Sequence, residues 1–352
     1  MSPRRIAMST ASPLRDARRW LPGVIVSLIA IVILAYLVNW RAVLLAFTTL
    51  DWRVIPFYIL LYFASTSSRA MASRTLLENR PTFGQSYIAM MQGYLLNNLL
   101  PLRLGEFGRA FLLGRKINVS MFHVLSTIVI ERVIDLAMAA ALTIVVLPRV
   151  VAMDWVKPVT YSTLTLVIIG MFSLALMARF RTLLHGWVAA IAERVALIRK
   201  FLLPIFDSLL DGLSALTSLR GSALTFGWMG LAWLFGVGNY WVLLRGFVPA
   251  APFWWALFVI GIASFGVALP SAPAALGVFE GAIVAALVLL GVSPSIALAY
   301  AILLHSFHIV ISGIVGFYGF AKDGESLMET YDKLINRQRG DQTPAKEDST
   351  SE

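Results

Sequence analysis

Six long apolar blocks constrain the fold of this chain more than any other feature of its sequence. They lie at 21–38, 54–68, 120–147, 158–178, 221–244 and 296–320. Each block approaches the roughly 20 residues that a helix needs to cross the hydrocarbon core of a bilayer. Because 59% of the 352 residues are hydrophobic and 14% are charged, the sequence predicts an all-α, polytopic integral membrane protein.

The distribution of positive charge predicts the topology, since cytoplasmic segments of membrane proteins are enriched in Lys and Arg. With the N-terminus in the cytoplasm, the inside segments 1–20, 69–80, 114–118 and 179–220 carry 16 Lys and Arg, and the outside segments carry five. We therefore expect both termini in the cytoplasm. The same distribution explains the net charge of +10 without a nucleic-acid partner, and none is expected.

Several classes of site have no support in the sequence. The chain has no cysteine, which excludes disulfides and thiolate metal sites. Neither the phosphate-binding G-x-x-x-x-G-K-[ST] loop nor the G-x-G-x-x-G dinucleotide fingerprint occurs. We therefore expect no catalytic residue set, no cofactor and no metal. Vectorial work would draw on the membrane potential, an ion gradient or the gradient of the lipid itself.

Two stretches that lie 172 residues apart share a motif. PLRLGEFGRA at 101–110 and PAALGVFEGA at 273–282 both contain P-x-x-L-G-x-F. The similarity continues after each stretch, where NVS at 118–120 corresponds to GVS at 291–293. The sequence therefore predicts an internal structural repeat, with units near 82–147 and 253–320.

Each unit is expected to contain a hairpin of broken helices. The segment 104–114 is too short to span a bilayer, and 82–100 before it ends at a proline. Segment 253–270 is likewise broken by prolines and returns through 274–291. The predicted turn residues are Pro101, Gly105, Pro270, Pro273 and Gly277.

Six full crossings with two re-entrant hairpins place the hairpins on opposite sides of the membrane. This is the arrangement of inverted repeats in transporters, in which broken helices meet near the midplane. A ten-crossing alternative, in which each hairpin spans the membrane twice, also places both termini on the same side of the membrane and stays open.

Three charges follow the apolar run of the first hairpin. Arg103, Glu106 and Arg109 would each cost roughly 2.5 to 3.5 kcal/mol at the bilayer centre if they faced lipid, so we expect them to face protein or a watery cavity. Helical spacing predicts that Glu106 pairs with Arg109. Arg103 precedes a helix N-terminus, and together they would bind an anion, most naturally a phosphate.

A second reading of these charges has equal weight. The next apolar block contains Glu131, Arg132 and Asp135, and the two groups of charges would then only neutralise one another. Buried ion pairs of this kind need no ligand.

The second unit has its own polar residues. At an offset of 173, Arg132 corresponds to His305 and Asp135 to His308. Glu280 follows the second hairpin turn and is a candidate partner for an arginine across the centre. The two histidines would carry protons, bind a phosphate or simply pack, and a metal site is disfavoured because few carboxylates accompany them.

Three segments lie outside the predicted core. Residues 1–20 form a basic cytoplasmic N-terminus, and 321–352 form a polar tail that is expected to be disordered. Residues 181–220 have apolar side chains at helical spacing beside basic ones, which predicts an amphipathic cytoplasmic helix near the headgroups. An ordinary interfacial linker is favoured there over a dedicated anionic-lipid site.

Three motifs resemble those of the lysylphosphatidylglycerol synthase transmembrane family of bacterial and archaeal membrane proteins. P-x-R-x-G-E-x-x-R occurs in full at 101–109, and E-R-x-x-D occurs at 131–135. The third, P-x-x-P-G-G-x-G-x-x-E, matches at 270–280 except that Ala274 and Ala275 replace the glycine pair. This departure removes backbone freedom at the second turn and would alter substrate choice.

The resemblance implies a fold and an activity. In the multiple-peptide-resistance proteins, a similar membrane module moves aminoacylated phosphatidylglycerol between leaflets, while a separate soluble domain attaches the amino acid. The resemblance covers roughly 20–320 and implies a flippase-like domain at 21–320 in the bacterial cytoplasmic membrane. We expect this chain to lack the synthase half.

Three functions are therefore considered. The first is a flippase or transporter for a phospholipid, aminoacyl phospholipid or polyprenyl-type lipid. The second is an integral membrane enzyme that uses Glu280 or a histidine as acid or base on a lipid phosphate. The third is a scaffold that recruits a lipid-synthesising enzyme, the candidate protein partner, through 181–220. The lipid and the oligomeric state are left open.

For the first function, the predicted ligand is a lipid with an anionic or phosphate headgroup. The predicted substrate-binding residues are Arg103, Arg109, Arg132, Glu280, His305 and His308. The predicted supporting charges are Glu106, Glu131 and Asp135.

Overall fold

The computed structural model describes residues 25–36, 38–100, 104–151, 156–180, 182–183, 185–186, 212–268 and 271–324. Within these residues the chain is helical and contains no strand. The predictions for 1–20, for most of 181–220 and for the tail after 324 fall outside the described residues. The described end of the 181–220 segment forms a 3-10 turn and the start of a long helix.

The described helices follow one another with short connections, except between Arg179 and Ser214, where most residues lie outside the described ranges. An unlabelled first helix, Ile25–Tyr36, precedes the labelled ones. The first half of the chain then contains α2 (Trp40–Thr48), η1 (Trp52–Val54), α3 (Ile55–Leu76), α4 (Phe83–Leu99), α5 (Leu104–Ile117), α6 (Met121–Val150) and α7 (Val156–Arg179). The second half contains η4 (Ser214–Thr217), α10 (Leu219–Phe247), α11 (Phe253–Ala268), η5 (Pro273–Ala275), α12 (Val278–Leu289) and α13 (Pro294–Asp323).

Each predicted crossing lies on a helix. By length and composition, α6 and α13 can cross a membrane, and Ile25–Tyr36 with α2 passes the same test as one span bent by 81°. Helices α3, α7 and α10 have 22, 24 and 29 residues, which is long enough at 1.5 Å per residue. The count of six full crossings stays a prediction.

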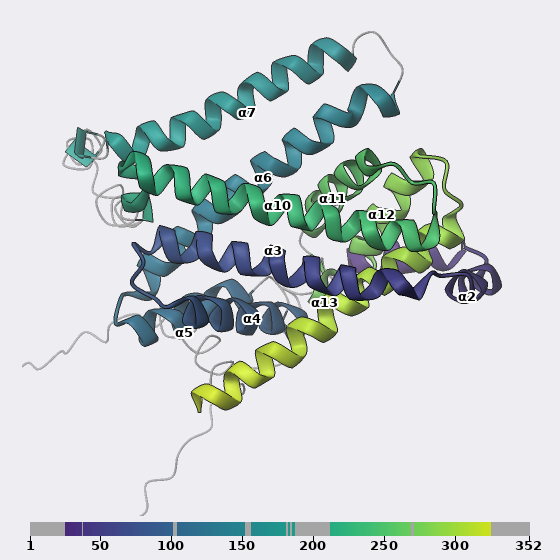
Figure 1. Cartoon of the computed structure of the whole chain (residues 1–352), viewed down its shortest axis with the longest axis horizontal. Helices are drawn as coiled ribbons and strands as arrows, with labels where there is room; N and C mark the ends of the chain where they lie inside the picture. The colour runs from purple at the N-terminus through teal and green to yellow at the C-terminus, as the bar shows by residue number, and fades with distance from the viewer. Residues whose placement is uncertain are drawn as a thin grey trace, which may run out of the picture.

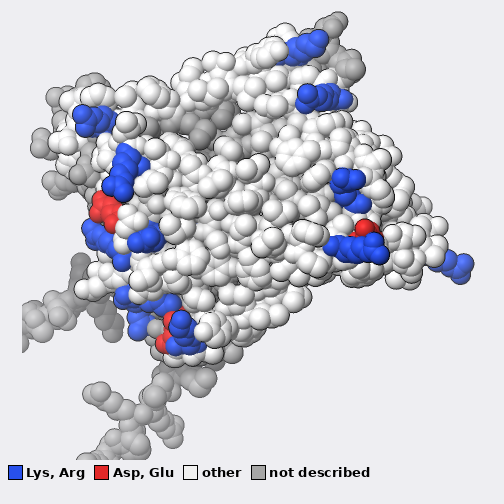
Figure 2. Space-filling model, viewed as in Figure 1, with Lys and Arg blue, Asp and Glu red and all other residues white. Residues whose placement is uncertain are grey.

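On the face shown in Figure 2, Lys and Arg gather at two opposite ends of the molecule, and a broad uncharged belt separates them. Many large apolar side chains are exposed on the outer helices, such as Tyr161, Leu166 and Phe172 of α7. A belt of this kind is expected where helices face lipid, because hydrocarbon tails solvate apolar side chains. The surface and the helix lengths together support a membrane location.

Two helical hairpins contain the shorter helices. Between α4 and α5 the amide of Gly105 donates to Oδ1 of Asn97 at 2.8 Å, and Gly93 faces both Gly105 and Arg109, so the two helices run antiparallel. In α11 and α12, Gly266 packs against Ala282 in the same antiparallel sense. Figure 1 places the α4–α5 hairpin toward one end of the long helices and the α11–α12 hairpin toward the other.

The centre of the molecule is the antiparallel contact between α3 and α10 (Figure 1). Ser65 donates from Oγ to the carbonyl of Ala232 at 2.7 Å, and Asn239 donates from Nδ2 to the carbonyl of Tyr58 at 2.8 Å. Around this contact, helices of one half pack on helices of the other half. Helix α4 packs on α13, and α11 packs on α6.

The two halves also agree in their element boundaries. Helices α6 and α13 have 30 residues each and begin 173 residues apart, at Met121 and Pro294. Both are capped by a serine side chain that accepts from a backbone amide three residues later, at Ser120 and Ser293. The offset of 173 that the sequence predicted for this part of the repeat therefore matches the helix starts.

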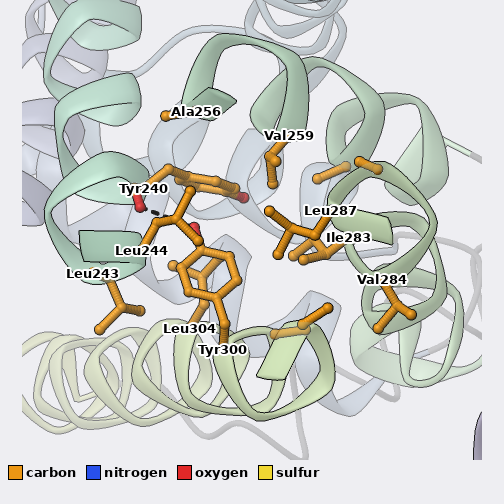
Figure 3. Close-up of a cluster of buried hydrophobic side chains, with 14 of the residues drawn as sticks. Tyr240, Leu243, Leu244, Ala256, Val259, Ile283, Val284, Leu287, Tyr300 and Leu304 are labelled. Atoms are coloured by element: carbon orange, nitrogen blue, oxygen red, sulfur yellow. Dashed lines mark hydrogen bonds between the residues drawn. The ribbon is translucent and has the colours of Figure 1, made fainter. Parts of the chain in front are cut away.

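The largest hydrophobic core lies where α10, α11, α12 and α13 meet (Figure 3). Tyr240, Ile283, Leu287, Tyr300 and Leu304 point toward one another in this core. The hydroxyl of Tyr300 donates to the carbonyl of Tyr240 at 3.0 Å, so its polar atom is satisfied inside the core. This packing fixes the wall of the cavity described below.

The tight α4–α5 contact generates a prediction. A Cβ on Gly105 would lie 2.0 Å from the carbonyl oxygen of Gly93 and 2.6 Å from Oδ1 of Asn97. Gly105→Ala is therefore expected to separate the hairpin and lower stability by about 1 to 3 kcal/mol, as overpacking does. Thermal unfolding of the purified protein in detergent, followed by tryptophan fluorescence, measures this change.

The matched control is Gly281→Ala. A Cβ there has no atom within 4 Å, and alanine favours a helix over glycine by about 1 kcal/mol. We expect this variant to equal or exceed the wild type in thermal stability. Equal stability of both variants would contradict the close contact at Gly105.

Candidate functional site

A cavity of about 640 Å³ lies between the α3–α10 pair and the tips of the two hairpins. Its apolar wall comes mainly from α11 and η5. Its polar wall comes from α3, α4, α5, α6 and α13. The ionisable side chains that line it are Tyr62, Arg69, Tyr94, Glu106, Arg132, Asp135, Tyr240, His305 and His308.

Asp135 organises the charged side of the cavity. Arg69 donates from Nη1 to both carboxylate oxygens of Asp135 at 2.8 Å, and Trp233 donates from Nε1 to Oδ1 at 3.0 Å. Arg132 lies 3.1 Å from Oδ2 through Nη2. The guanidinium of Arg69 also lies 5.9 Å from the ring centre of Trp233, within reach of a cation–π attraction. One carboxylate therefore orients two arginines and a tryptophan.

Arg132 is the arginine of this group that is least engaged. Its side chain is 31% exposed, against 20% for Arg69. Its Nε lies 3.7 Å from Oε1 of Glu106, too far for a hydrogen bond, and it has no hydrogen-bond partner among the described residues. Because this Nε is itself buried, Arg132 meets the cavity through the terminal part of its partly exposed guanidinium group.

The expected pairing of Glu106 with Arg109 was wrong. Arg109 instead makes a bidentate pair with Glu131, at 2.8 and 2.9 Å, and donates to Oγ of Ser73 at 2.6 Å. Arg109 and Glu131 are each 4% exposed and neither lines the cavity. The spacing of Glu106 and Arg109 allows a pair, but the side of α5 that carries Arg109 faces the buried side of α6.

Arg69 was missed by the sequence reasoning, which placed it in a cytoplasmic segment at 69–80. In the structure α3 continues to Leu76, so Arg69 lies inside this helix. The signal was the polar run STSSR at 65–69 within an apolar block. Of these residues, Ser65, Thr66 and Arg69 line the cavity.

On the side of the second hairpin, Glu280 and His305 form a close pair. Nδ1 of His305 lies 2.6 Å from Oε1 of Glu280. The other carboxylate oxygen, Oε2, accepts from the amide of Gly277 at 2.7 Å and caps the start of α12. Glu280 is buried behind His305, and only His305 of the two lines the cavity.

His308 also lines the cavity, in an aromatic setting. Its ring lies 5.3 Å from that of Tyr62, 6.2 Å from that of Tyr240 and 6.3 Å from that of Phe279. All four residues that the offset of 173 pairs, namely Arg132, Asp135, His305 and His308, therefore face one cavity.

The turn of the second hairpin has the positive φ angles that glycine favours, although alanines replace the glycine pair of the motif. Ala274 and Ala275 have φ of 57° and 54°, and both line the cavity. Gly277 has φ of 81°. The loss of the two glycines therefore leaves the backbone left-handed, at a steric cost of roughly 1 to 2 kcal/mol for each alanine. Pro273 begins η5, while Pro101, Arg103 and Pro270 lie outside the described residues.

A family model described as the lysylphosphatidylglycerol synthase TM region matches residues 20–316. The chain belongs to this family. The match covers both hairpins, all the cavity-lining residues and the antiparallel α3–α10 pair. No curated protein and no solved structure matches the chain. Membership identifies a membrane protein related to lipid metabolism or transport.

The Arg109–Glu131 pair generates a stability prediction. Removal of one partner leaves a buried charge unpaired, which costs about 3 to 5 kcal/mol. Arg109→Met is therefore expected to lower the unfolding temperature strongly. The double variant Arg109→Met with Glu131→Met is expected to recover much of the loss, because no charge is then stranded. A double variant as unstable as the single one would contradict this role.

The left-handed alanines generate a second prediction. Ala274→Gly and Ala275→Gly are expected to raise the unfolding temperature by a few degrees, because relief of about 1 to 2 kcal/mol of strain exceeds the entropy that glycine loses on folding. Gly277→Ala is the opposite control. Its Cβ would lie 2.7 Å from Cγ1 of Ile31 and 2.8 Å from the carbonyl oxygen of Ser27. In thermal unfolding, Ala274→Gly and Ala275→Gly should therefore melt above the wild type, and Gly277→Ala should melt below it.

Proposed function

We propose that this protein is a lipid flippase or transporter, which moves a phosphate-bearing lipid between the leaflets of the bacterial cytoplasmic membrane. The headgroup would pass through the cavity between the hairpin tips while the acyl or prenyl tails remain in the bilayer. The observation that carries the proposal is Arg132, a partly engaged arginine on the wall of a 640 Å³ cavity among membrane-length helices.

The contact with the headgroup is assigned to Arg132. A guanidinium offers five donors, and phosphate accepts two of them side by side. Asp135 and Glu106 hold Arg132 from two sides, so its position is set before a ligand arrives. Arg103, which precedes α5, keeps its predicted role as a second contact on the argument from sequence.

The remaining charges support this contact in the proposal. Arg69 donates to both oxygens of Asp135, and Arg132 contacts the carboxylate only at Oδ2, which it shares with Arg69. Arg109, predicted as a direct contact, would instead fix α5 against α6 through Glu131. This division accommodates both readings of the charges, since some neutralise one another and one arginine stays available.

We infer that the two halves form an inverted repeat. The helices that precede the two repeat units, α3 and α10, run antiparallel at the centre, and each hairpin packs on the 30-residue helix of the other unit, α4 on α13 and α11 on α6. The twofold axis of such a repeat would lie in the membrane plane and would let the two halves exchange roles between an inward-open and an outward-open form. The bias of Lys and Arg supports cytoplasmic termini.

A transport assay tests the proposal. Proteoliposomes that contain a panel of headgroup-labelled lipids report transbilayer movement in the wild type and in Arg132→Gln. One charge-assisted hydrogen bond contributes about 1.5 to 3 kcal/mol, so we expect the variant to move the substrate lipid about 10- to 100-fold more slowly. Arg41→Gln is the matched control, because Arg41 is exposed on α2 and does not line the cavity.

Three outcomes would contradict the proposal. Equal rates in Arg132→Gln and the wild type would remove Arg132 from the site. A new lipid species in the mass spectrum, without transbilayer movement, would instead favour the membrane-enzyme alternative. Loss of function only on changes to the surface of 181–220 would favour the scaffold.

A further inference from the structure

The proposed function makes no use of the buried pair on the opposite cavity wall. Glu280 has both carboxylate oxygens occupied, one by the amide of Gly277 and one by Nδ1 of His305. An ionised carboxylate has no hydrogen to donate and can only accept. The hydrogen on Nδ1 of His305 is therefore donated to Glu280, and this fixes the tautomer of the neutral ring.

The second ring nitrogen of His305 faces the cavity. His305 lines the cavity and Glu280 lies behind it, so the Nδ1 edge points into the protein and the Nε2 edge points to the open space. With Nδ1 protonated, neutral His305 presents a lone pair on Nε2. A proton from cavity water at Nε2 would convert this acceptor into a donor.

The charge of the wall depends on this proton. Without it, the pair carries one negative charge, which disfavours an anion in the cavity. With it, the pair is neutral and presents an N–H group to the cavity. Charged groups are costly at membrane depth, so an anionic headgroup and a proton each favour the binding of the other.

We propose that the Glu280–His305 pair is a proton-binding site, which takes up one proton when an anionic phosphate headgroup enters the cavity. The proton passes from water to Nε2, one N–H bond forms, and the proton returns to water when the headgroup leaves. The inference rests on the proposed function, because it names what regulates the same cavity. Movement of the lipid would thereby be coupled to movement of a proton.

Other titratable groups face the same space. The tyrosines at the cavity are Tyr62 on α3, Tyr94 on α4 and Tyr240 on α10, and tyrosine titrates near pH 10, outside the range considered. Helix α11 has no titratable side chain. On α13, His308 also lines the cavity and is the competing candidate.

The charged groups of the far wall complete the set. Arg69 and Arg132 are paired with Asp135 and Glu106. Arginine stays protonated throughout, and the carboxylates titrate near pH 4 in water. Histidine is the residue type at this cavity whose ordinary pKa lies near neutral, and of the two histidines only His305 has a carboxylate at its Nδ1.

The test measures lipid affinity as a function of pH with the purified full chain in detergent. The probe is headgroup-labelled phosphatidylglycerol, a phosphodiester whose own charge is constant between about pH 5.5 and 8.5, the range in which histidine titrates. For one linked proton, we expect the affinity of the wild type to rise by up to about tenfold for each unit by which the pH falls.

Three variants locate the proton. His305→Gln is expected to abolish the pH dependence, and Glu280→Gln, which keeps an oxygen for the amide of Gly277, is expected to weaken it. His308→Gln is expected to retain the slope of the wild type. An unchanged slope in His305→Gln, or a pH-independent wild type, would overturn the inference.

A second readout does not depend on the variants. Addition of the lipid to the wild type in weakly buffered solution should withdraw about one proton for each lipid bound, as a pH indicator reports. No proton uptake on binding would refute the proton site.

Arg132→Gln at a fixed pH separates the two proposals. If lipid binding is weakened by Arg132→Gln but does not depend on pH in the wild type, only the proton site is refuted. If Arg132→Gln leaves lipid binding unaffected, the assignment of the headgroup contact is refuted. No binding of the phosphodiester by the wild type at any pH would refute both.

Discussion

The cost of a charge in hydrocarbon governs the arrangement of this protein. Besides Arg115 and Lys116 in the last turn of α5, five described charged residues lie on the first hairpin and on the face of α6 beside it: Glu106, Arg109, Glu131, Arg132 and Asp135. None of them can face lipid without a cost of several kcal/mol. They are accommodated in two ways, as a closed pair between Arg109 and Glu131 and as an open group around Asp135 at the cavity. The first arrangement fixes α5 against α6, and the second forms the charged side of the cavity.

The antiparallel α3–α10 pair holds in place two side chains that contact Asp135. Arg69 of α3 and Trp233 of α10 both reach Asp135, so the central contact also supports the charged wall. The opposite wall belongs to α12 and α13, which the apolar core of Figure 3 holds in place. A wall of paired arginines and carboxylates and a Glu–His wall thus border one space, and their ionisable residues come from different halves of the chain.

Several parts of the fold and site follow from sequence because they depend on local or repeated patterns. The apolar blocks fall on helices, and the offset of 173 matches the starts of α6 and α13. The same offset brings Arg132 and His305 to one cavity. By contrast, the position of Arg69 inside α3 was missed, because a charge at the end of an apolar block has the same pattern as a cytoplasmic loop.

The sequence by itself determined that the chain is helical and belongs in a membrane, that it is broken at two proline-containing turns, and that its buried charges need partners. These properties follow from composition and from spacing along the chain. Only the tertiary structure decided which charges meet. Glu106 pairs with Arg132 and Arg109 with Glu131, because the rotation of α5 against α6 directs each side chain, and helix rotation depends on packing across the whole fold.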